Sequence, residues 1–250
     1  MRDFRGLMRT ASAGASRRAA AWVAVAMAAG ILAMPMRAGA TVTQGQVDDF
    51  EDNTLANWHM GPNNPVPESN VTGGGPAGAN DNYMRLVSNG AGGAGGKMVV
   101  FNDLQQWSGD FLAAHVDEIQ MQVNSFLIAP PPAGGQQTLN LRLILTGTTG
   151  SLCTVSNVLV TPGSGWITAH FPLNAANLTG GSTSILSSIT EVDLVHSPTP
   201  ITFRSASPAV AAQLGVDNIR AVTVPEPTMV GGAATAAALA AVMRRGRRRA

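Results

Sequence analysis

The stretch "HVDEIQMQVNSF", His115 to Phe126, decides the fold class because apolar and polar side chains alternate along most of it. Val116, Ile119, Met121 and Val123 fall largely on one side of an extended chain, while glutamate, glutamine and asparagine side chains take the other. In a second stretch, "TLNLRLIL" at residues 138–145, every second residue is leucine. Successive side chains of a β-strand point to opposite faces. Strands patterned in this way belong to antiparallel sheets with one face on a core.

The rest of the central sequence is also typical of short strands separated by turns. No stretch sustains a 3.6-residue apolar period with helix caps, whereas glycine, proline, serine and asparagine interrupt the apolar runs repeatedly. Ten short strands predict two packed sheets, and so an all-β antiparallel sandwich over residues 41–223. The single cysteine, Cys153, excludes an internal disulfide, so a hydrophobic core must provide the stability. The further strand candidates are "QVDDFE", "NYMRLVS", "KMVVFND", "CTVSNVLV", "WITAHFPL", "ITEVDLVHS", "PITFRS" and "VDNIRAV".

Residues 1–40 have the three parts of a secretory signal peptide. Arginines precede an apolar stretch from Ala19 to Met34, and Ala38-Gly39-Ala40 is typical of a cleavage site, which predicts a signal helix and a mature chain beginning at Thr41. The export machinery is therefore an expected partner. Ser16-Arg17-Arg18 leaves the twin-arginine route open, and an uncleaved membrane anchor is the alternative interpretation.

The charge distribution argues against nucleic acid as a partner. The whole chain has a formal charge of +1, yet residues 41–224 carry five basic and thirteen acidic side chains, a net charge of −8. A nucleic-acid-binding surface needs clustered basic side chains to neutralise phosphates. Divalent cations or neutral polar ligands suit this acidic domain better.

The last residues, 224–250, have an order of their own. Pro225-Glu226-Pro227 is followed by an apolar run, Met229 to Met243, expected to form a short helix, and then by a terminal arginine cluster. This order resembles the bacterial PEP-CTERM sorting signal. The resemblance implies recognition by a membrane enzyme of the exosortase type, a transient inner-membrane tether through residues 229–243, and delivery to the cell surface or extracellular matrix. A solvated basic tail is the alternative. The cluster consists of Arg244, Arg245, Arg247, Arg248 and Arg249.

Four stretches of the central sequence resemble galactose-binding-like and carbohydrate-binding-module jelly rolls, and more loosely the laminin-B type domain. They are "DFEDNTLANW" (Asp49–Trp58), "NDLQQWSGDF" (Asn102–Phe111), "GSGWITAHFPL" (Gly163–Leu173) and "VDNIRAV" (Val216–Val222). The resemblance implies jelly-roll connections between the two sheets.

The same resemblance implies a structural calcium ion, Ca2+, shared by the first and last strands. Glu51 and Asp217 match the expected ligands, and Asp49 or Asp52 would complete them. Asp217 alternates with Ile219, so its carboxylate is expected to point inward, where it needs a cation or hydrogen-bond donors to offset lost hydration. The alternatives are that Asp217 caps a turn or accepts backbone N–H bonds, and that residues 48–52 form a solvated acidic edge.

Sugar binding is the next candidate function, with exopolysaccharide as the expected partner. Trp58 and Trp107 lie beside expected loops and are candidate aromatic platforms, although core or rim packing is the favoured interpretation for both. Trp166 is expected to be structural, as its counterpart is in the families that match. The polar faces of two expected strands add candidate hydrogen-bonding residues, which are Gln120, Gln122, Asn140 and Arg142.

An enzyme is the less favoured interpretation. The histidines are scattered, and neither a nucleophile elbow nor a phosphate-binding loop is present, so no catalytic residue is predicted. Glu118 and Glu191 are strand-borne glutamates that a glycan-active hydrolase could use on a jelly-roll scaffold. The sequence therefore predicts an exported, non-enzymatic protein of adhesion or weak polysaccharide binding. A secreted hydrolase and a purely structural matrix component are the alternatives.

Overall fold

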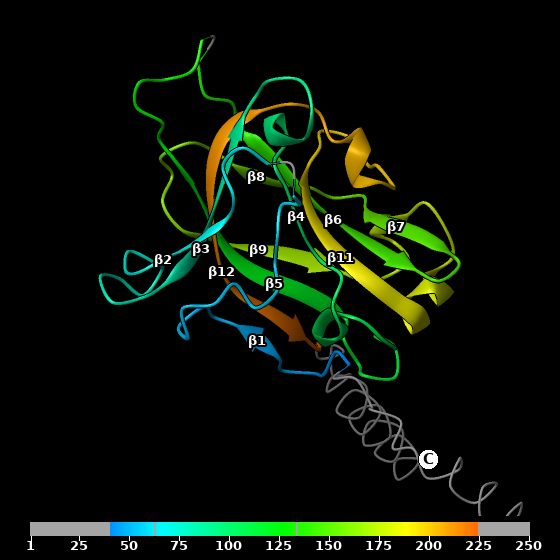
Figure 1. The fold of residues 1–250 in the computed structure, drawn as a ribbon. Coiled ribbons are helices and arrows are strands. Elements are labelled where there is room, and N and C mark those ends of the chain that lie inside the picture. The colour runs from blue at the N-terminus through cyan, green and yellow to red at the C-terminus, as the bar shows by residue number, and fades with distance from the viewer. Residues whose placement is uncertain (1–40, 63, 134, 225–250) are drawn as a thin grey trace, which may run out of the picture. The chain divides into compact units, whose positions relative to one another are not determined.

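The computed structural model describes residues 41–224 except 63 and 134, and these residues form two antiparallel six-stranded sheets (Figure 1). Sheet 1 has the order β2-β3-β12-β5-β9, with β1 also paired to β12. Its strands are β1 (Val47–Asp48), β2 (Ser69–Val71), β3 (Tyr83–Asn89), β5 (Glu118–Phe126), β9 (Ile167–Pro172) and β12 (Ala211–Val222).

Sheet 2 has the order β10-β7-β6-β11-β4, with β8 also paired to β6. Four short 3-10 helices lie in the described loops: η1 (Ala94–Gly96), η2 (Gln105–Trp107), η3 (Thr183–Ser188) and η4 (Arg204–Ala206). The strands of sheet 2 are β4 (Val99–Asn102), β6 (Leu139–Gly147), β7 (Gly150–Thr154), β8 (Val158–Val160), β10 (Leu178–Thr179) and β11 (Ile189–His196).

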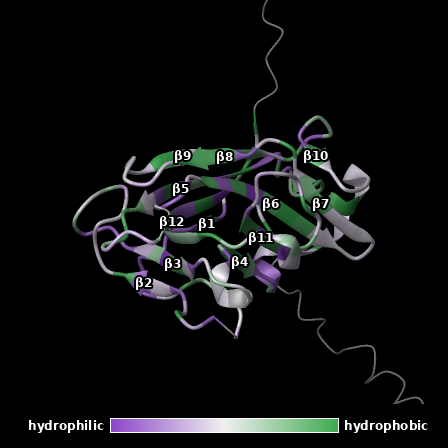
Figure 2. Cartoon of the chain, turned by 90° about the horizontal axis from the view of Figure 1, so that it is seen from above, coloured by the Kyte–Doolittle hydropathy of each residue, from purple (hydrophilic) through white to green (hydrophobic). Residues whose placement is uncertain are grey.

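The chain crosses between the two sheets repeatedly, as expected for a jelly roll. β3 belongs to sheet 1, β4 to sheet 2, β5 to sheet 1 and β6 to sheet 2, and β12 closes the chain in sheet 1. Viewed from above, the strands of sheet 1 lie to the left and most of those of sheet 2 to the right (Figure 2). The predicted all-β antiparallel sandwich is therefore confirmed.

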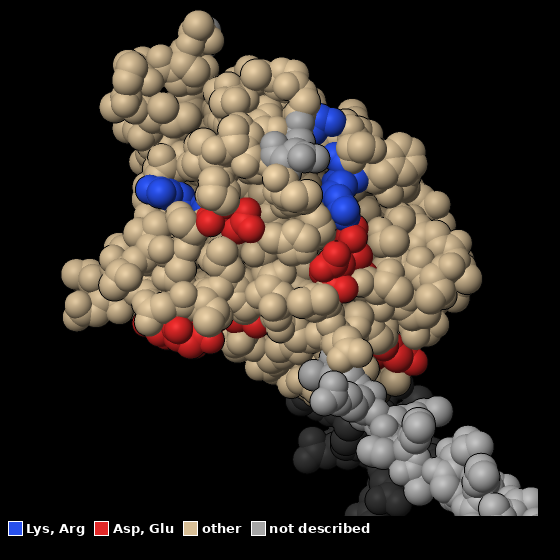
Figure 3. All heavy atoms as spheres, in the orientation of Figure 1, with Lys and Arg blue, Asp and Glu red and all other residues tan. Residues whose placement is uncertain are grey.

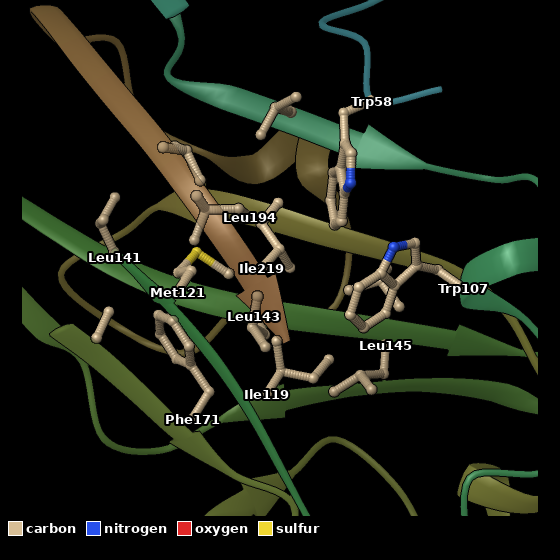
Figure 4. Close-up of a cluster of buried hydrophobic side chains, with 14 of the residues drawn as sticks. Trp58, Trp107, Ile119, Met121, Leu141, Leu143, Leu145, Phe171, Leu194 and Ile219 are labelled. Carbon is tan, nitrogen blue, oxygen red and sulfur yellow. The ribbon is translucent and has the colours of Figure 1, made fainter. Parts of the chain in front are cut away.

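The main core lies between the sheets, and the alternating stretches supply much of it. Ile119, Met121 and Val123 of β5 are at most 1% exposed. Leucines 139, 141, 143 and 145 of β6 pack in the same cluster, which Figure 4 shows in close-up. Burying one such side chain contributes roughly 1.5–3 kcal/mol. The alternation read from the sequence is thus the alternation between core and outer face.

The outer face of sheet 2 is also partly covered. A second apolar cluster packs there, formed by Val99, Phe101, Ile144, Cys153 and Val195, with Ile201 packed against it. The segment 197–207, which connects β11 to β12, contributes Ile201 to this cover. Sheet 2 therefore has apolar residues on both faces at this position, whereas polar residues dominate the outer face of sheet 1.

The two flanking segments predicted from the sequence lie outside the described residues. These are the signal peptide at 1–40 and the sorting tail, of which residues 225–250 are not described. Within the described part of the chain, no helix has the length and apolar character needed to cross a membrane.

Candidate functional site on the outer face of sheet 1

Polar side chains from three neighbouring strands surround a shallow hollow of about 160 Å³ on the outer face of sheet 1. Gln120 and Gln122 come from β5, Thr168 from β9, and Asn218 and Arg220 from β12. The strand register brings them together, because Gln122 pairs with Thr168 on one side and Gln120 with Arg220 on the other. The two glutamines predicted as ligand candidates therefore lie in one hydrogen-bonding surface.

A β-bulge in β12 shapes this hollow. The register against β5 shifts between Asp217 and Arg220, and Asn218 has the left-handed backbone angle φ of 51°. The Asn218 side chain donates to Oε1 of Gln122 (2.9 Å), and its own Oδ1 accepts from Nη2 of Arg220 (3.1 Å). Bulges re-aim side chains in this way. The amides and the guanidinium are held in fixed orientations, which lowers the entropy cost of binding a polar ligand.

An aromatic cluster adjoins the polar residues on the same outer face. It consists of Tyr83, Phe126 and Trp166, whose ring centroids lie 5.3–6.0 Å apart. The Trp166 indole donates to the carbonyl of Gly74 (3.1 Å), so the loop after β2 is attached to the cluster. Gly215 of β12 lies beneath these three rings, and a Cβ added there would come within 2.8 Å of the Trp166 ring. Glycine is required there because the rings pack directly on the β12 backbone.

An imidazole–carboxylate pair closes the other end of the polar surface. Nδ1 of His170 lies 2.5 Å from Oε1 of Glu118, whose side chain is only 8% exposed, while the His170 side chain is 56% exposed. His170 is the cross-strand partner of Gln120. Glu118 is thus paired, and its carboxylate does not stand free beside the hollow.

The predicted calcium residues lie near the β1 end of the same sheet. Asp217 is fully buried, and its carboxylate accepts from the backbone N–H (2.6 Å) and side chain (2.7 Å) of Asn218. Burial raises the pKa of Asp217 to about 7, the Asn218 N–H opposes this shift, and the negative charges of Asp81, Glu51 and Asp49 add to it. Several carboxylates therefore act on one buried acid.

The surroundings of Glu51 and Asp49 are more ordinary. Oε1 of Glu51 accepts from the N–H of Asn82 (2.7 Å), and Oδ1 of Asp49 accepts from the N–H of Glu51 (3.3 Å). Asp52 caps the turn at Thr54 instead of pointing to Asp217. Across residues 41–224 as described, no group of three or more His, Cys, Asp or Glu side chains is arranged to hold a metal ion.

Trp58 and Trp107 occupy the core, as the core-packing interpretation expects, and so they are not sugar platforms. They are 1% and 0% exposed, their ring centroids lie 5.8 Å apart, and Figure 4 shows both among the buried side chains. Both indole N–H groups donate to Oδ2 of Asp48, at 2.7 Å and 2.6 Å. Their polar atoms are satisfied inside the protein, so neither ring is available to a ligand.

Arg142 is likewise buried, contrary to its prediction as a ligand residue beside Gln120 and Gln122. It lies on β6 in sheet 2 and is 3% exposed. Its guanidinium donates to the carbonyls of Ser197 (2.9 Å), Thr154 (2.9 Å) and Pro198 (2.8 Å). Arg142 therefore ties the segment 197–207 to sheet 2. Asn140 is on the same strand, so the two predicted polar faces belong to different sheets.

The two glutamates considered for catalysis also lie on different sheets. Glu118 is on the outer face of β5 in sheet 1, and Glu191 is on the outer face of β11 in sheet 2, where it is paired with Arg204. Glycoside hydrolysis needs its two carboxyl groups about 5–10 Å apart across one bond. Glu118 and Glu191 cannot form such a pair because the core separates their faces.

Several residues of the site were missed from the sequence. Phe126, Thr168, Asn218 and Arg220 were not singled out. Trp166 was expected to be structural, and its packing on Gly215 and its hydrogen bond to Gly74 agree with this. The alternation in "WITAHF" could have placed Trp166 and Thr168 on the face opposite Phe171. The bulge at Asn218 leaves no comparable signal, because it depends on the pairing with β5.

Fold and site together define an antiparallel β-sandwich domain with a polar and aromatic outer face. No protein-family model and no curated protein matches the chain. Among solved structures, it is similar to an exo-beta-agarase at 13% identity and a TM-score of 0.49, over 74% of this chain and 25% of the agarase. The chain thus spans about a quarter of that enzyme's length.

Two further structures are similar at lower TM-scores. Both are described as a "putative glycoside hydrolase", one from Bacteroides thetaiotaomicron (11% identity, TM-score 0.43) and one from Bacteroides vulgatus (12% identity, TM-score 0.32). The first similarity covers 75% of this chain and 73% of the other chain, and the second covers 62% of this chain and 76% of the other chain. At these identities and TM-scores, none of the similarities indicates a function for this chain.

Proposed function

We propose that this chain is a non-enzymatic glycan-binding protein that holds a neutral polysaccharide against the outer face of sheet 1. The observation that carries the proposal is the hollow lined by Gln120, Gln122, Thr168, Asn218 and Arg220, with the aromatic cluster beside it. Amide and hydroxyl groups match the alternating donors and acceptors of sugar hydroxyls. Aromatic rings offer apolar area to the C–H faces of a sugar.

The geometry favours weak binding. The hollow of about 160 Å³ is smaller than the roughly 300–1,000 Å³ typical of small-molecule sites. It is also open to solvent, and Gln120, Gln122 and Asn218 are only half-buried. A single sugar unit would be held by a few hydrogen bonds, so useful attachment to a polymer would depend on repeated contacts along the chain.

Export and sorting complete the proposed role, and they rest on the sequence. A signal peptide at 1–40 and the Pro225-Glu226-Pro227 tail would deliver the sandwich to the cell surface or matrix, after processing by an exosortase-type enzyme. The C-terminal peptide map of the exported protein should then end before Met229. An intact arginine cluster on exported protein would contradict this part of the proposal.

A structural calcium ion is part of the same proposal. Asp217 fits it, because a fully buried carboxylate beside other acids is stabilised by a cation. Asp217 and Glu51 would supply carboxylate oxygens, and backbone carbonyls or asparagine amides would supply the remaining oxygens that calcium requires. Such an ion would fasten the loop after β1 to β12 and so support the bulge that orients Asn218.

A glycan array followed by titration calorimetry tests the binding. We expect neutral polysaccharide to bind, and Gln122→Ala to weaken it roughly three- to tenfold because one ligand bond and the Asn218 contact are lost. Gln105→Ala is the matched control, since Gln105 is exposed and outside the hollow. Equal affinity for the Gln122 variant and wild type would contradict the proposal. Silence on the array with self-association would favour a purely structural matrix component instead.

A further inference from the structure

A second pocket, of about 300 Å³, lies beside β4 at the outer face of sheet 2. Met60, Val99 and Phe101 form its apolar floor, and Lys97 and Arg204 lie at its rim. We call it the β4 pocket. It lies on the opposite side of the core from the hollow of sheet 1, and its volume falls at the lower end of the range for small-molecule sites.

The Arg204 guanidinium is held in a fixed plane with one edge free. Its Nη1 bonds Oε1 of Glu191 and lies 3.4 Å from Oδ1 of Asp193, while its carbon is 3.7 Å from the centroid of the Phe101 ring. Nε and Nη2 donate no hydrogen bond within the described part of the chain. An oriented pair of N–H groups of this kind matches the two oxygens of a carboxylate.

Lys97 adds a second cation to the lining of the same pocket. Its ammonium donates to the carbonyl of Ser205, which leaves two of its three donors for a ligand. Of the five basic side chains in residues 41–224, two therefore converge on one pocket in a domain of net charge −8. Figure 3 shows basic side chains grouped next to acidic ones on the face that it draws.

The nearby acids leave these donors available. Glu191 is already paired with Arg204, and burial together with the charge of Glu191 raises the pKa of Asp193 to about 8. Burial thus disfavours the charged form of Asp193. Glu68 is likewise engaged, because its Oε2 accepts from the backbone N–H of Met60 (3.0 Å).

We propose that the β4 pocket binds the carboxylate of a hexuronic acid unit in an acidic polysaccharide. The Nε and Nη2 edge of Arg204 and the Lys97 ammonium would take the carboxylate, and Met60 and Val99 would contact the apolar face of the sugar ring. This site goes beyond the neutral-glycan surface of sheet 1 and does not depend on it. Two sites on opposite faces would let one molecule bridge two polysaccharide chains, with the gain in avidity that linked sites provide.

Titration calorimetry of the full chain with trigalacturonic acid, and with the same trisaccharide after carboxyl reduction, tests this proposal. The acidic ligand should bind about tenfold more tightly than the reduced one, since hydrogen bonds to charged groups are the stronger class. Lys97→Gln should lower affinity for the acidic ligand about tenfold and leave the reduced ligand unaffected, whereas Lys97→Arg should restore binding.

Two further variants distinguish the β4 pocket from binding elsewhere on the domain. Gln122→Ala, on sheet 1, should leave trigalacturonic acid affinity unchanged, and Arg204→Lys should lower it while keeping the charge. A melting curve for each variant confirms folding, and Lys97→Gln is expected to fold because it loses only the Ser205 contact. Equal binding of the acidic and reduced ligands, unchanged affinity in Lys97→Gln, or no binding of either by wild type overturns the β4 site. The results for Lys97→Gln and Arg204→Lys bear on the β4 pocket alone, because both residues lie outside the hollow of sheet 1, whereas neutral-glycan binding there is tested by the array and by Gln122→Ala.

Discussion

Replacing Asp48 should reveal how strongly one carboxylate holds the two buried tryptophans. Asp48 lies on β1, and its Oδ2 accepts from the indole N–H groups of Trp58 and Trp107 and, at 3.3 Å, from Nε2 of Gln106. The rings are at most 1% exposed, and both indole N–H groups depend on half-buried Asp48 for their acceptor. Asp48→Ala therefore leaves two donors buried without a partner.

The expected loss follows from these two donors. Each unsatisfied buried donor costs about 1–3 kcal/mol, so the pair should cost about 2–6 kcal/mol of the free energy of unfolding. Asp48→Asn should cost about 1 kcal/mol or less, because all three bonds end on one oxygen and an amide oxygen can replace it. Burial raises the pKa of Asp48 because the charged carboxylate loses hydration. The neutral amide of asparagine avoids this cost.

Urea unfolding followed by tryptophan fluorescence measures both variants. Asp117→Ala is the matched control, because Asp117 is exposed and its side chain makes no hydrogen bond with the described residues. A loss of less than about 1 kcal/mol in Asp48→Ala would refute this role of Asp48, and so would an Asp48→Asn variant as unstable as Asp48→Ala. Either result would mean that the indole N–H groups find other partners.

Three further predictions concern the metal, the pH dependence and the aromatic cluster. Calcium should raise the melting temperature, chelator should lower it, and Asp217→Ala should remove the response; an unchanged response in that variant would exclude Asp217 as a ligand. Because the pKa of Asp193 is raised to about 8, its contribution to stability is complete below about pH 4 and is lost as the pH rises through about 8. Melting curves between pH 5 and 9 should show this fall, and Asp193→Asn should flatten it. Gly215→Ala should cost about 1–3 kcal/mol and weaken glycan binding by displacing the aromatic rings, whereas Gly92→Ala, in open space, should do neither.

The sandwich can be predicted from the sequence because a strand with one buried face and one solvent-exposed face alternates apolar and polar residues. The pattern at Ile119, Met121 and Val123 follows directly from the core side of β5. It says less about the outer side, where Arg142 looks like the polar residue of an exposed face. In the structure Arg142 is buried by the segment 197–207, whose carbonyls it binds. Alternation thus separates the two faces of a strand without showing what covers the outer one.

The candidate site was only half predictable for a related reason. Gln120 and Gln122 were found because they share one strand, and local sequence determines which residues share a strand face. Trp58 stayed open between core and ligand site because an indole beside a loop has the same local pattern whether its N–H meets solvent or a buried acceptor. The acceptor, Asp48, is ten residues away, and its second donor, Trp107, is 59 residues away. Such pairings depend on tertiary contacts that no local pattern contains.

The two outer faces are the reason that we propose binding and not catalysis for this domain. On sheet 1, Glu118 is paired with His170 and the open residues are amides, a hydroxyl and one arginine, which bind sugars without activating a bond. On sheet 2, the buried acid Asp193 is 1% exposed, so it cannot reach a substrate, and Glu191 is engaged by Arg204. On each face the strand-borne glutamate is thus engaged by a neighbouring basic or imidazole side chain, and donors remain for the ligands that we propose. A protein with one neutral and one acidic glycan site on opposite faces is suited to joining the polymers of a matrix.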